Sequence, residues 1–209
     1  MEKIRDKNGL SNAPRPCESF DLIGGTLDIP TSSSPLFSAV RLENAMKSVI
    51  RSFCVEAECK SRRDQGQSTA GLCPHEDMLF RDKTCTRTVV LAMTRGNVNA
   101  PPTLFTTYDS STAFESCTIW QIARATLAAV GFFESIRLGR DGIEFVDAAF
   151  WYNNPCEVLL QEAQNQFPER QQMRILSIGT GLGDVVTIED SPASVTKALR
   201  RMAKHLPNE

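Results

Sequence analysis

The stretch that most constrains this fold is IEFVDAAFWYNNP, residues 143–155. Its apolar first half ends abruptly at one carboxylate, Asp147, and a turn sequence, Asn153–Pro155, follows. An apolar strand with an acid at its carboxyl end is how an open α/β sheet carries a side chain to its functional edge. The small residues Ala148 and Ala149 would let other groups approach the carboxylate. A plainer interpretation is that Asp147 only caps a strand-to-helix turn.

Length and composition limit the class of protein. The 209 residues fit one domain or a large part of one, and 41% hydrophobic with 23% charged residues is ordinary for a soluble globular chain. The net charge of −2 argues against non-specific binding to nucleic acid. The sequence has no apolar run near the roughly 20 residues that cross a bilayer. Since the start, MEKIRDKNGL, lacks a signal-peptide core, we expect a cytoplasmic protein with at most peripheral membrane contact.

The cysteines do not follow a disulfide pattern. There are seven, an odd number, scattered over positions 17 to 156. Several lie in apolar or helical surroundings, where cysteine behaves as a small hydrophobe, so a reducing compartment fits better than a disulfide framework. The nearest approach to a metal site is Cys54, Cys59, Cys73 and His75. Because these residues lack the Cys-x-x-Cys pairs of zinc ribbons and fingers, we predict no metal and no cofactor.

The order of the expected elements indicates an α/β fold with a mainly parallel sheet. The expected strands cover residues 20–23, 86–93, 143–147 and 174–178, and the expected helices cover 36–55, 116–133 and 157–167. The strand at 86–93 is the richest in β-branched residues and should be central in the sheet. The remaining segments are an irregular lead-in, a flexible loop insertion and a C-terminal amphipathic helix, at residues 1–19, 56–84 and 191–209.

Two glycine-containing stretches imitate known motifs without their context. Residues 179–183 (GTGLG) do not have the spacing of a dinucleotide loop, and a strand-like stretch follows instead of a helix. Residues 66–71 (GQSTAG) imitate a nucleophile elbow, but loop sequence flanks them on both sides. The imidazoles, His75 and His205, do not follow a strand, so a Ser-His-Asp triad has no base. Acyl-transfer chemistry would therefore depend on Asp147.

Four blocks, in this order, resemble the patatin-like phospholipase family, most of all its fungal branch. The blocks are FDLIGGT at 20–26, IWQIARATLAAVGFF at 119–133, FVDAAFWYNNP at 145–155 and ILSIGTG at 175–181. The resemblance implies a three-layer α/β/α fold with a mainly parallel central sheet over residues 20–190. It also implies a serine–aspartate dyad that hydrolyses acyl esters of phospholipids or acylglycerols.

The resemblance assigns one catalytic role in this chain. In the family the base is the aspartate of an Asp-Gly-Gly or Asp-Gly-Ala motif, which Asp147-Ala148-Ala149 matches. The resemblance therefore implies that Asp147 is the dyad base and takes the serine proton directly, without an intervening histidine. The partner would be a phospholipid or acylglycerol substrate, and nucleic acid is not expected.

The departures from the family pattern concern the nucleophile. The family turn reads Gly-Thr-Ser-x-Gly-Gly, with the serine directly after the threonine, whereas Thr26 is followed by Leu27. Prolines and serines, among them Ser32–Ser34, replace the helix that should follow, as if a segment had been deleted after Thr26. The glycine-rich oxyanion loop of the family has no counterpart in residues 1–19. We therefore predict no nucleophile and no oxyanion hole, and each lost oxyanion donor costs roughly 3–4 kcal/mol of transition-state stabilisation.

Three interpretations of function stay open at this point. The chain is a hydrolase-family domain that is inactive without its serine, a lipid- or partner-binding module, or the product of an incomplete gene model. In the binding interpretation, Arg124 and the basic tail helix contact anionic lipid heads. An incomplete parallel sheet would also expose an edge strand, so we expect poor solubility or self-association through that edge. The sequence does not indicate a head-group or acyl-chain preference.

Overall fold

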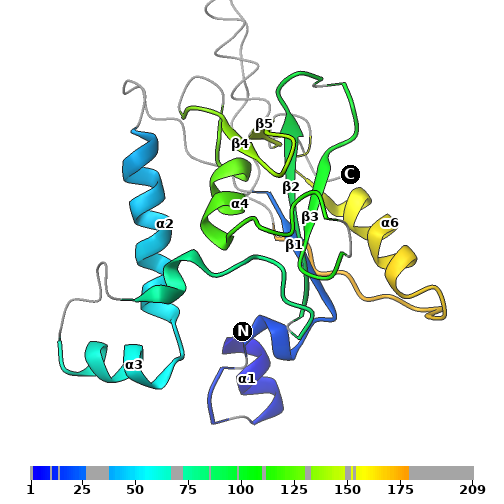
Figure 1. Ribbon diagram of the computed structural model, residues 1–209. Helices are drawn as coiled ribbons and strands as arrows, with labels where there is room; N and C mark the ends of the chain where they lie inside the picture. Colours follow the sequence, from blue (N-terminus) through cyan, green and yellow to red (C-terminus); the bar gives the residue numbers. More distant parts are fainter. Residues whose placement is uncertain are drawn as a thin grey trace, which may run out of the picture.

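The protein is an α/β fold built on one five-stranded sheet (Figure 1). The computed structural model describes residues 2–9, 11–13, 15–26, 38–66, 73–84, 86–97, 99–109, 112–129, 133–148, 152 and 154–178. In these ranges the elements are α1 (Glu2–Asn8), η1 (Pro16–Glu18), β1 (Leu22–Gly25), α2 (Ala39–Phe53), α3 (Ala57–Asp64), η2 (Pro74–Asp77), β2 (Arg87–Thr94), β3 (Thr103–Thr106), α4 (Ile119–Thr126), β4 (Ile136–Leu138), β5 (Ile143–Asp147) and α6 (Cys156–Gln166). Among these helices, none combines the length and apolar character needed to cross a membrane.

The strand β2 is the centre of the sheet, as its sequence predicts. It pairs in parallel with β1 and antiparallel with β3 and β5, and β4 pairs antiparallel with β5. The expectation of a mainly parallel sheet is therefore wrong, because one of the four pairings in the described residues is parallel. The connections at residues 95–102 and 139–142 are too short for the crossover that parallel neighbours require, so the strands they join are antiparallel.

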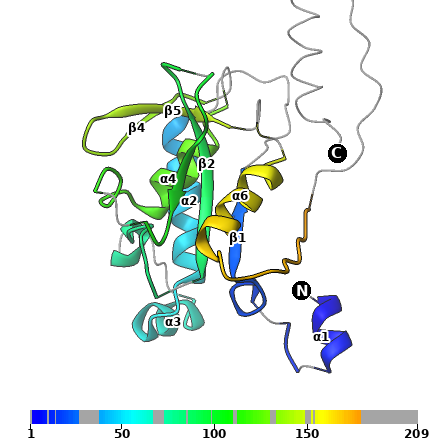
Figure 2. The same cartoon turned by 90° about the vertical axis from the view of Figure 1, so that its right-hand side faces the viewer.

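The sheet has an apolar core on each face. Along β2, Val89, Leu91 and Met93 pack into a core that includes Val158 and Leu159 of α6. The alternate residues, Val90 and Ala92, pack into the other core, which includes Ile122 and Ala125 of α4. Figure 2 shows α4 and α6 on opposite sides of β2. Helices thus cover both faces, which explains why β2 is apolar without interruption rather than alternating.

The helix α4, expected over residues 116–133, is shorter at both ends and covers Ile119–Thr126. Thr118 is the cap: its hydroxyl accepts a hydrogen bond from the amide of Gln121, whose side chain returns to the amide of Thr118. The helix was expected to continue to residue 133 but ends at Thr126. The chain then turns, and the carbonyl of Ala128 accepts a hydrogen bond from the amide of Asp147 (3.1 Å). Pairing with the end of β5 replaces further helical turns.

The helices α2 and α6 lie within three residues of their predicted bounds, but α2 has a largely exposed apolar face. Ser38 caps α2 by accepting a hydrogen bond from the amide of Arg41 (3.4 Å). Val49 and Phe53, which fall on the apolar stripe of the helix sequence, are 53% and 78% exposed. The helix packs mainly along α4 and η2, and none of its residues is fully buried, so the outer part of its apolar stripe stays exposed.

Two predictions near the ends of the described chain are wrong. The lead-in is not wholly irregular, because it contains α1 and η1. Residues 174–178 do not form a buried strand: residues 172–178 have no regular structure, and Ile175 and Ile178 are 60% and 87% exposed. A short apolar run forms a strand only where another strand offers a free edge. The predicted glycine loop at 179–183 and the tail helix at 191–209 lie outside the described residues.

The segment expected as a flexible loop insertion, residues 56–84, contains α3 and η2 in its described part. It also packs against α4. Leu79 forms a β-bridge with Thr118, and the indole of Trp120 donates a hydrogen bond to Asp77 (2.8 Å). This segment is therefore joined to the body of the protein on both sides, through α2 and through the start of α4.

Candidate active site at the end of β5

The carboxyl ends of β1 and β5 meet along one edge of β2. Val90 pairs with both β1 and β3, and Ala92 pairs with both β3 and β5. Because a residue in a sheet has one neighbour on each side, β1 and β5 occupy the same edge of β2, opposite β3. Since β1 runs parallel and β5 antiparallel to β2, these two strands point toward each other. The residues that follow β1 therefore come close to the last residue of β5.

Asp147 occupies the end of β5 and is 8% exposed. Its carboxylate oxygen Oδ1 accepts a hydrogen bond from the hydroxyl of Thr26 at 3.5 Å, across a sequence separation of 121 residues. This distance is at the long limit for such a bond, so the contact is weak. It nevertheless places the carboxylate beside the residue that follows the two glycines, one position before Leu27. Leu27 itself lies outside the described residues.

The chain after Asp147 follows the predicted order of strand, small residues and turn. The amide of Tyr152 donates to the carbonyl of Ala148 (2.8 Å), and Asn154 accepts a hydrogen bond from the amide of Cys156 at the start of α6 (3.2 Å). Ala148 is fully buried in the core shared with α6, whereas β5 alternation places Asp147 on the α4 side with Phe145. The methyl group of Ala148 therefore packs on the face of the sheet opposite to Asp147. Ala149 lies outside the described residues.

The two glycines of the family-like block lie inside β1 and pair with Val89 and Val90, so they form strand rather than a turn. A Cβ atom at Gly24 would lie 2.3 Å from Cδ2 of Leu159, so a side chain there would have to displace that leucine of α6. Nothing lies within 4 Å of the same position at Gly25. Gly24 thus leaves room for Leu159 of α6 to pack against β1, the strand that leads to Thr26.

A second carboxylate on β5, Glu144, is no candidate for the base. Hydrogen bonds from the hydroxyl of Ser135 and from Arg95 (2.5 Å) hold the pKa of this carboxyl below its usual range. It is thus committed to charged and polar partners at the β4–β5 hairpin. Asp147 is the better placed of the two carboxylates for acyl-transfer chemistry, because it lies beside the end of β1.

A surface cavity of about 530 Å³ lies away from Asp147. Its lining includes Asp21 and Arg87, which stand at the amino ends of β1 and β2. Asp147 is close to the carboxyl end of β1 instead, so the cavity lies at the other end of the same strands. Asp21 already forms an ion pair with Arg170 (2.7 Å). The cavity is therefore separate from the candidate site.

The remaining candidates from the sequence fall into three groups. Arg124, expected to face lipid, is half-buried at the end of α4, where its Nη2 donates to the carbonyl of Glu134 (3.3 Å). The serines at 32–34, most of the elbow-like stretch at 66–71, and His205 lie outside the described residues.

The four residues whose spacing argued against a metal, three cysteines and one histidine, do lie together. Their ligand atoms are all within 4.8 Å of one another: Cys54, Cys59, Cys73 and His75.

Sequence reasoning singled out these four residues but rejected a metal site, because their spacing matches no familiar zinc motif. The usable signal was a Cys-x-His pair (Cys73 and His75) that follows a helical segment with two further cysteines. Comparison with known proteins adds no assignment for either site: no protein-family model matches the chain, and no curated protein matches it.

Proposed function

We propose that this chain is a patatin-like lipid acyl hydrolase domain by descent that has kept the aspartate of the dyad and lost the serine. The contact between Thr26 and Asp147 carries this proposal. In the family pattern the nucleophile directly follows this threonine, so a serine at position 27 would follow the residue that touches the carboxylate. The convergence of β1 and β5 gives the physical reason for that contact.

The chemistry of a dyad explains why the proposal includes loss of turnover. A carboxylate base accelerates ester hydrolysis only when it takes a proton from a nucleophile within hydrogen-bond reach. Leucine has no proton to give, and removal of the serine from a serine hydrolase lowers kcat by about 10⁶-fold. We therefore expect the chain to hold an acyl ester, at most, without cleaving it.

The test restores the missing group. Leu27→Ser should react with a fluorophosphonate probe, which labels serines activated by a neighbouring base, whereas the wild-type chain should not. The double variant Leu27→Ser with Asp147→Asn should lose the labelling, because asparagine cannot accept the proton. Mass spectrometry of the labelled peptide identifies the modified residue.

A matched control separates position from mere exposure. Thr31→Ser introduces a serine into the same proline-rich stretch and should stay unlabelled. The proposal fails if Leu27→Ser stays unlabelled in a folded protein, or if Asp147→Asn leaves its labelling unchanged. Hydrolysis of a fluorogenic ester by the wild-type chain that persists in Asp147→Ala would contradict the assigned role of the aspartate.

Lipid binding without turnover is the second candidate, and the outer face of α2 favours it. Val49 and Phe53 are 53% and 78% exposed on that face, and apolar side chains so exposed are typical of interaction surfaces. The net charge of −2 favours a zwitterionic over an anionic surface. Co-sedimentation with phosphatidylcholine vesicles should fall in the double variant Val49→Ser with Phe53→Ser. It should persist in Asn44→Ser, and equal binding by both variants would exclude this surface.

A further inference from the structure

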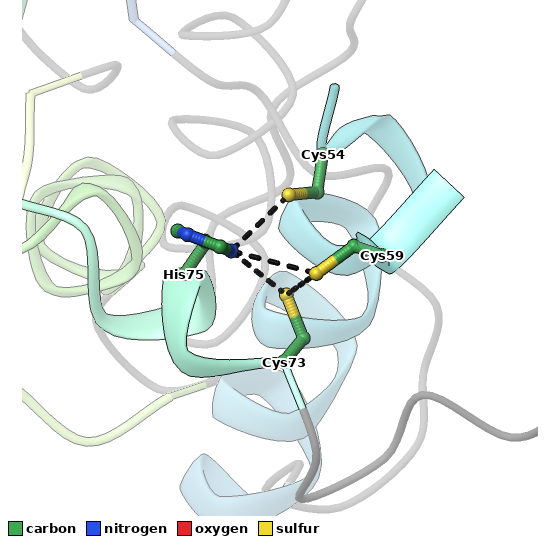
Figure 3. A group of neighbouring side chains, drawn as sticks. All are labelled: Cys54, Cys59, Cys73 and His75. Atoms are coloured by element: carbon green, nitrogen blue, oxygen red, sulfur yellow. Dashed lines mark hydrogen bonds between the residues drawn. The ribbon is translucent and has the colours of Figure 1, made fainter. Parts of the chain in front are cut away.

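Three thiols and one imidazole from separate elements converge where α2 ends (Figure 3). Cys54 is the C-cap of α2, Cys59 lies in α3, and Cys73 and His75 lie at the start of η2. The Nδ1 atom of His75 is 3.4, 3.5 and 3.6 Å from the sulfur atoms of Cys54, Cys59 and Cys73. The sulfur atoms of Cys59 and Cys73 are 3.5 Å apart. Figure 3 shows the three sulfurs directed at one nitrogen.

These distances match the edges of a tetrahedral zinc complex. With bonds of about 2.3 Å to sulfur and 2.0 Å to nitrogen, tetrahedral angles give sulfur–sulfur edges of about 3.8 Å and sulfur–nitrogen edges of about 3.5 Å. The three sulfur–nitrogen distances at His75 fall within about 0.1 Å of that value. The Cys59–Cys73 sulfur distance is about 0.3 Å shorter than the sulfur–sulfur edge. Three thiolates and an imidazole are also a donor set that binds zinc in structural sites.

We propose that Cys54, Cys59, Cys73 and His75 bind one structural Zn²⁺ ion. All four tetrahedral positions are supplied by the protein, which distinguishes a structural site from a catalytic one, where water holds the fourth position. A maximum separation of 4.8 Å between the donor atoms suits a single ion. The three cysteines are 8%, 5% and 3% exposed, so the ion would be shielded from solvent by its own ligands.

The energetics of this part of the chain call for such an ion. Among the described residues of 54–77, only the three cysteines are buried, and they form an apolar cluster by themselves. The helix α3 (AECKSRRD) contributes Ala57 and Cys59 as its only apolar residues. Since apolar burial is the main favourable term in folding, this segment has too little of it to order α3 and η2. A coordinated metal supplies folding free energy directly in such cases.

Two arginines tie together the segments that carry the ligands. The guanidinium of Arg63 binds the carbonyl oxygens of Arg51 and Cys54 (2.9 and 2.5 Å), at the end of α2 that carries the first ligand. Arg51 in turn pairs with Glu76, the residue after His75 (2.5 Å). These contacts fix the ligand-bearing segments relative to each other.

The proposed ion has a defined structural consequence. It joins the end of α2 to η2, and η2 continues into the residues that pair with the start of α4. Lys47 of α2 reinforces this connection by binding Asp77 (3.5 Å) and lying over the ring of Trp120. Because α2 has no fully buried residue, the zinc ion would add a second attachment for this helix, beside its packing on α4.

Metal analysis of the purified full chain tests the proposal. The chain should be expressed in a reducing cytoplasm and purified without chelator. It should then contain one zinc ion per chain, measured by inductively coupled plasma mass spectrometry. Replacement by cobalt should give the strong visible absorption of a tetrahedral cobalt–thiolate complex. Cys59→Ser and Cys73→Ser should lower the metal affinity by more than the roughly 10–100-fold that loss of a supporting hydrogen bond causes. Cys17→Ser and Cys156→Ser, outside the cluster, should retain the full content.

A conservative variant keeps the test decisive if the serine variants fail to fold. His75→Cys should still bind one ion, now through four thiolates, with a cobalt spectrum shifted by the extra sulfur ligand. Chelation of the wild-type chain should change its circular dichroism spectrum, and addition of zinc afterwards should restore the native spectrum. A folded chain without bound metal, or a Cys59–Cys73 disulfide in that chain, would overturn the proposal. Equal metal loss in Cys17→Ser and Cys59→Ser would overturn it too.

Discussion

Two regions of the molecule differ in how their functional groups are supported by apolar packing: the sheet edge at Asp147, and the cluster of Cys54, Cys59, Cys73 and His75. The sheet edge has a complete scaffold: two strand ends converge on it, and apolar cores cover both faces of the sheet. Under the proposed function its chemistry is incomplete, since a leucine follows Thr26 where the family pattern has the serine. The cluster has the reverse balance, with a full set of ligands on a segment that has almost no apolar core.

This difference teaches how each region depends on its polar residues. At the sheet edge the fold positions the carboxylate, so loss of the chemistry leaves the scaffold in place. In the cluster the ligands are themselves the scaffold, so loss of the bound ion should release the segment. The site at Asp147 is thus held in place by an apolar core, whereas the proposed zinc site replaces an apolar core in stabilising its segment.

Chelation of zinc should have the largest effect and should separate the two regions. Structural zinc contributes about 10 kcal/mol or more of folding free energy in small domains. Even a third of that would lower the Tm by ~10 °C in a chain of this length. Hydrogen exchange should show that the amides of α2, α3 and η2 lose protection while those of β2 keep it. Equal loss of protection in β2 would show that the cluster and the sheet unfold as one unit.

Phe145→Ala should produce the opposite pattern. Phe145 is fully buried and packs edge-to-face against Phe105 and Phe114, with ring centroids 5.0 and 5.7 Å away. Its truncation should cost about 3–5 kcal/mol of unfolding free energy, measured by denaturant titration. The matched control is Ile143→Ala on the same strand, 37% exposed, which should cost under ~1 kcal/mol. A similar cost for both variants would contradict the assigned core.

Ionisation of Tyr108 should make the stability of the sheet region, and not that of the cluster, depend on alkaline pH. Burial, and then the hydrogen bond that its hydroxyl donates to Glu162 (2.5 Å), raise the pKa of this phenol above its usual value. The unfolded chain ionises Tyr108 near pH 10 while the folded chain resists. Stability from this group is thus complete below pH ~10 and falls as the pH rises further.

The variant Tyr108→Phe removes that dependence. It should also cost about 1 kcal/mol at neutral pH, at the low end for a hydrogen bond to a charged group, because the pair is only half-buried. Thermal melts of both proteins at neutral and alkaline pH provide the measurement. An unchanged slope of Tm against alkaline pH in the variant would assign the dependence to other groups.

Arg170→Ala should have the smallest effect. Arg170 and Asp21 pair at 2.7 Å, but their side chains are 46% and 62% exposed, and such surface pairs contribute little to stability. The hydrogen bond from Arg170 lowers the pKa of Asp21, so the pair stabilises above the usual aspartate pKa and loses this effect as the pH falls. We expect an unchanged Tm at neutral pH and an Asp21 pKa, followed by NMR, that returns to its usual range.

Local sequence signals predicted several elements well. The β-branched run of β2, the strand that ends at Asp147 and the Thr118 cap of α4 all follow from residues close together in the chain. Hydrogen bonding and side-chain alternation act over a few residues there, so the sequence shows them directly. The same reasoning failed at 174–178, where apolar residues have the right composition but no described strand pairs with them.

The directions of the strands, and the close approach of the three cysteines and His75, could not be predicted in this way. Strand direction depends on which edges are free once β2 has formed and on connections too short to cross over. The cluster depends on α3 folding back against the end of α2, which brings Cys59 next to Cys73 across 14 positions. Neither arrangement leaves a periodic pattern in the sequence.

The sequence by itself determined where much of the central part of this chain becomes strand or helix, and that a buried strand ends at the carboxylate of Asp147. Only the tertiary structure decided what that carboxylate meets and which thiols lie together. Thr26 and Asp147 are 121 positions apart, and their contact arises because two strands end at the same point on one edge of β2. Such contacts depend on long-range topology, in which residues far apart in the chain are brought together only after the core has formed.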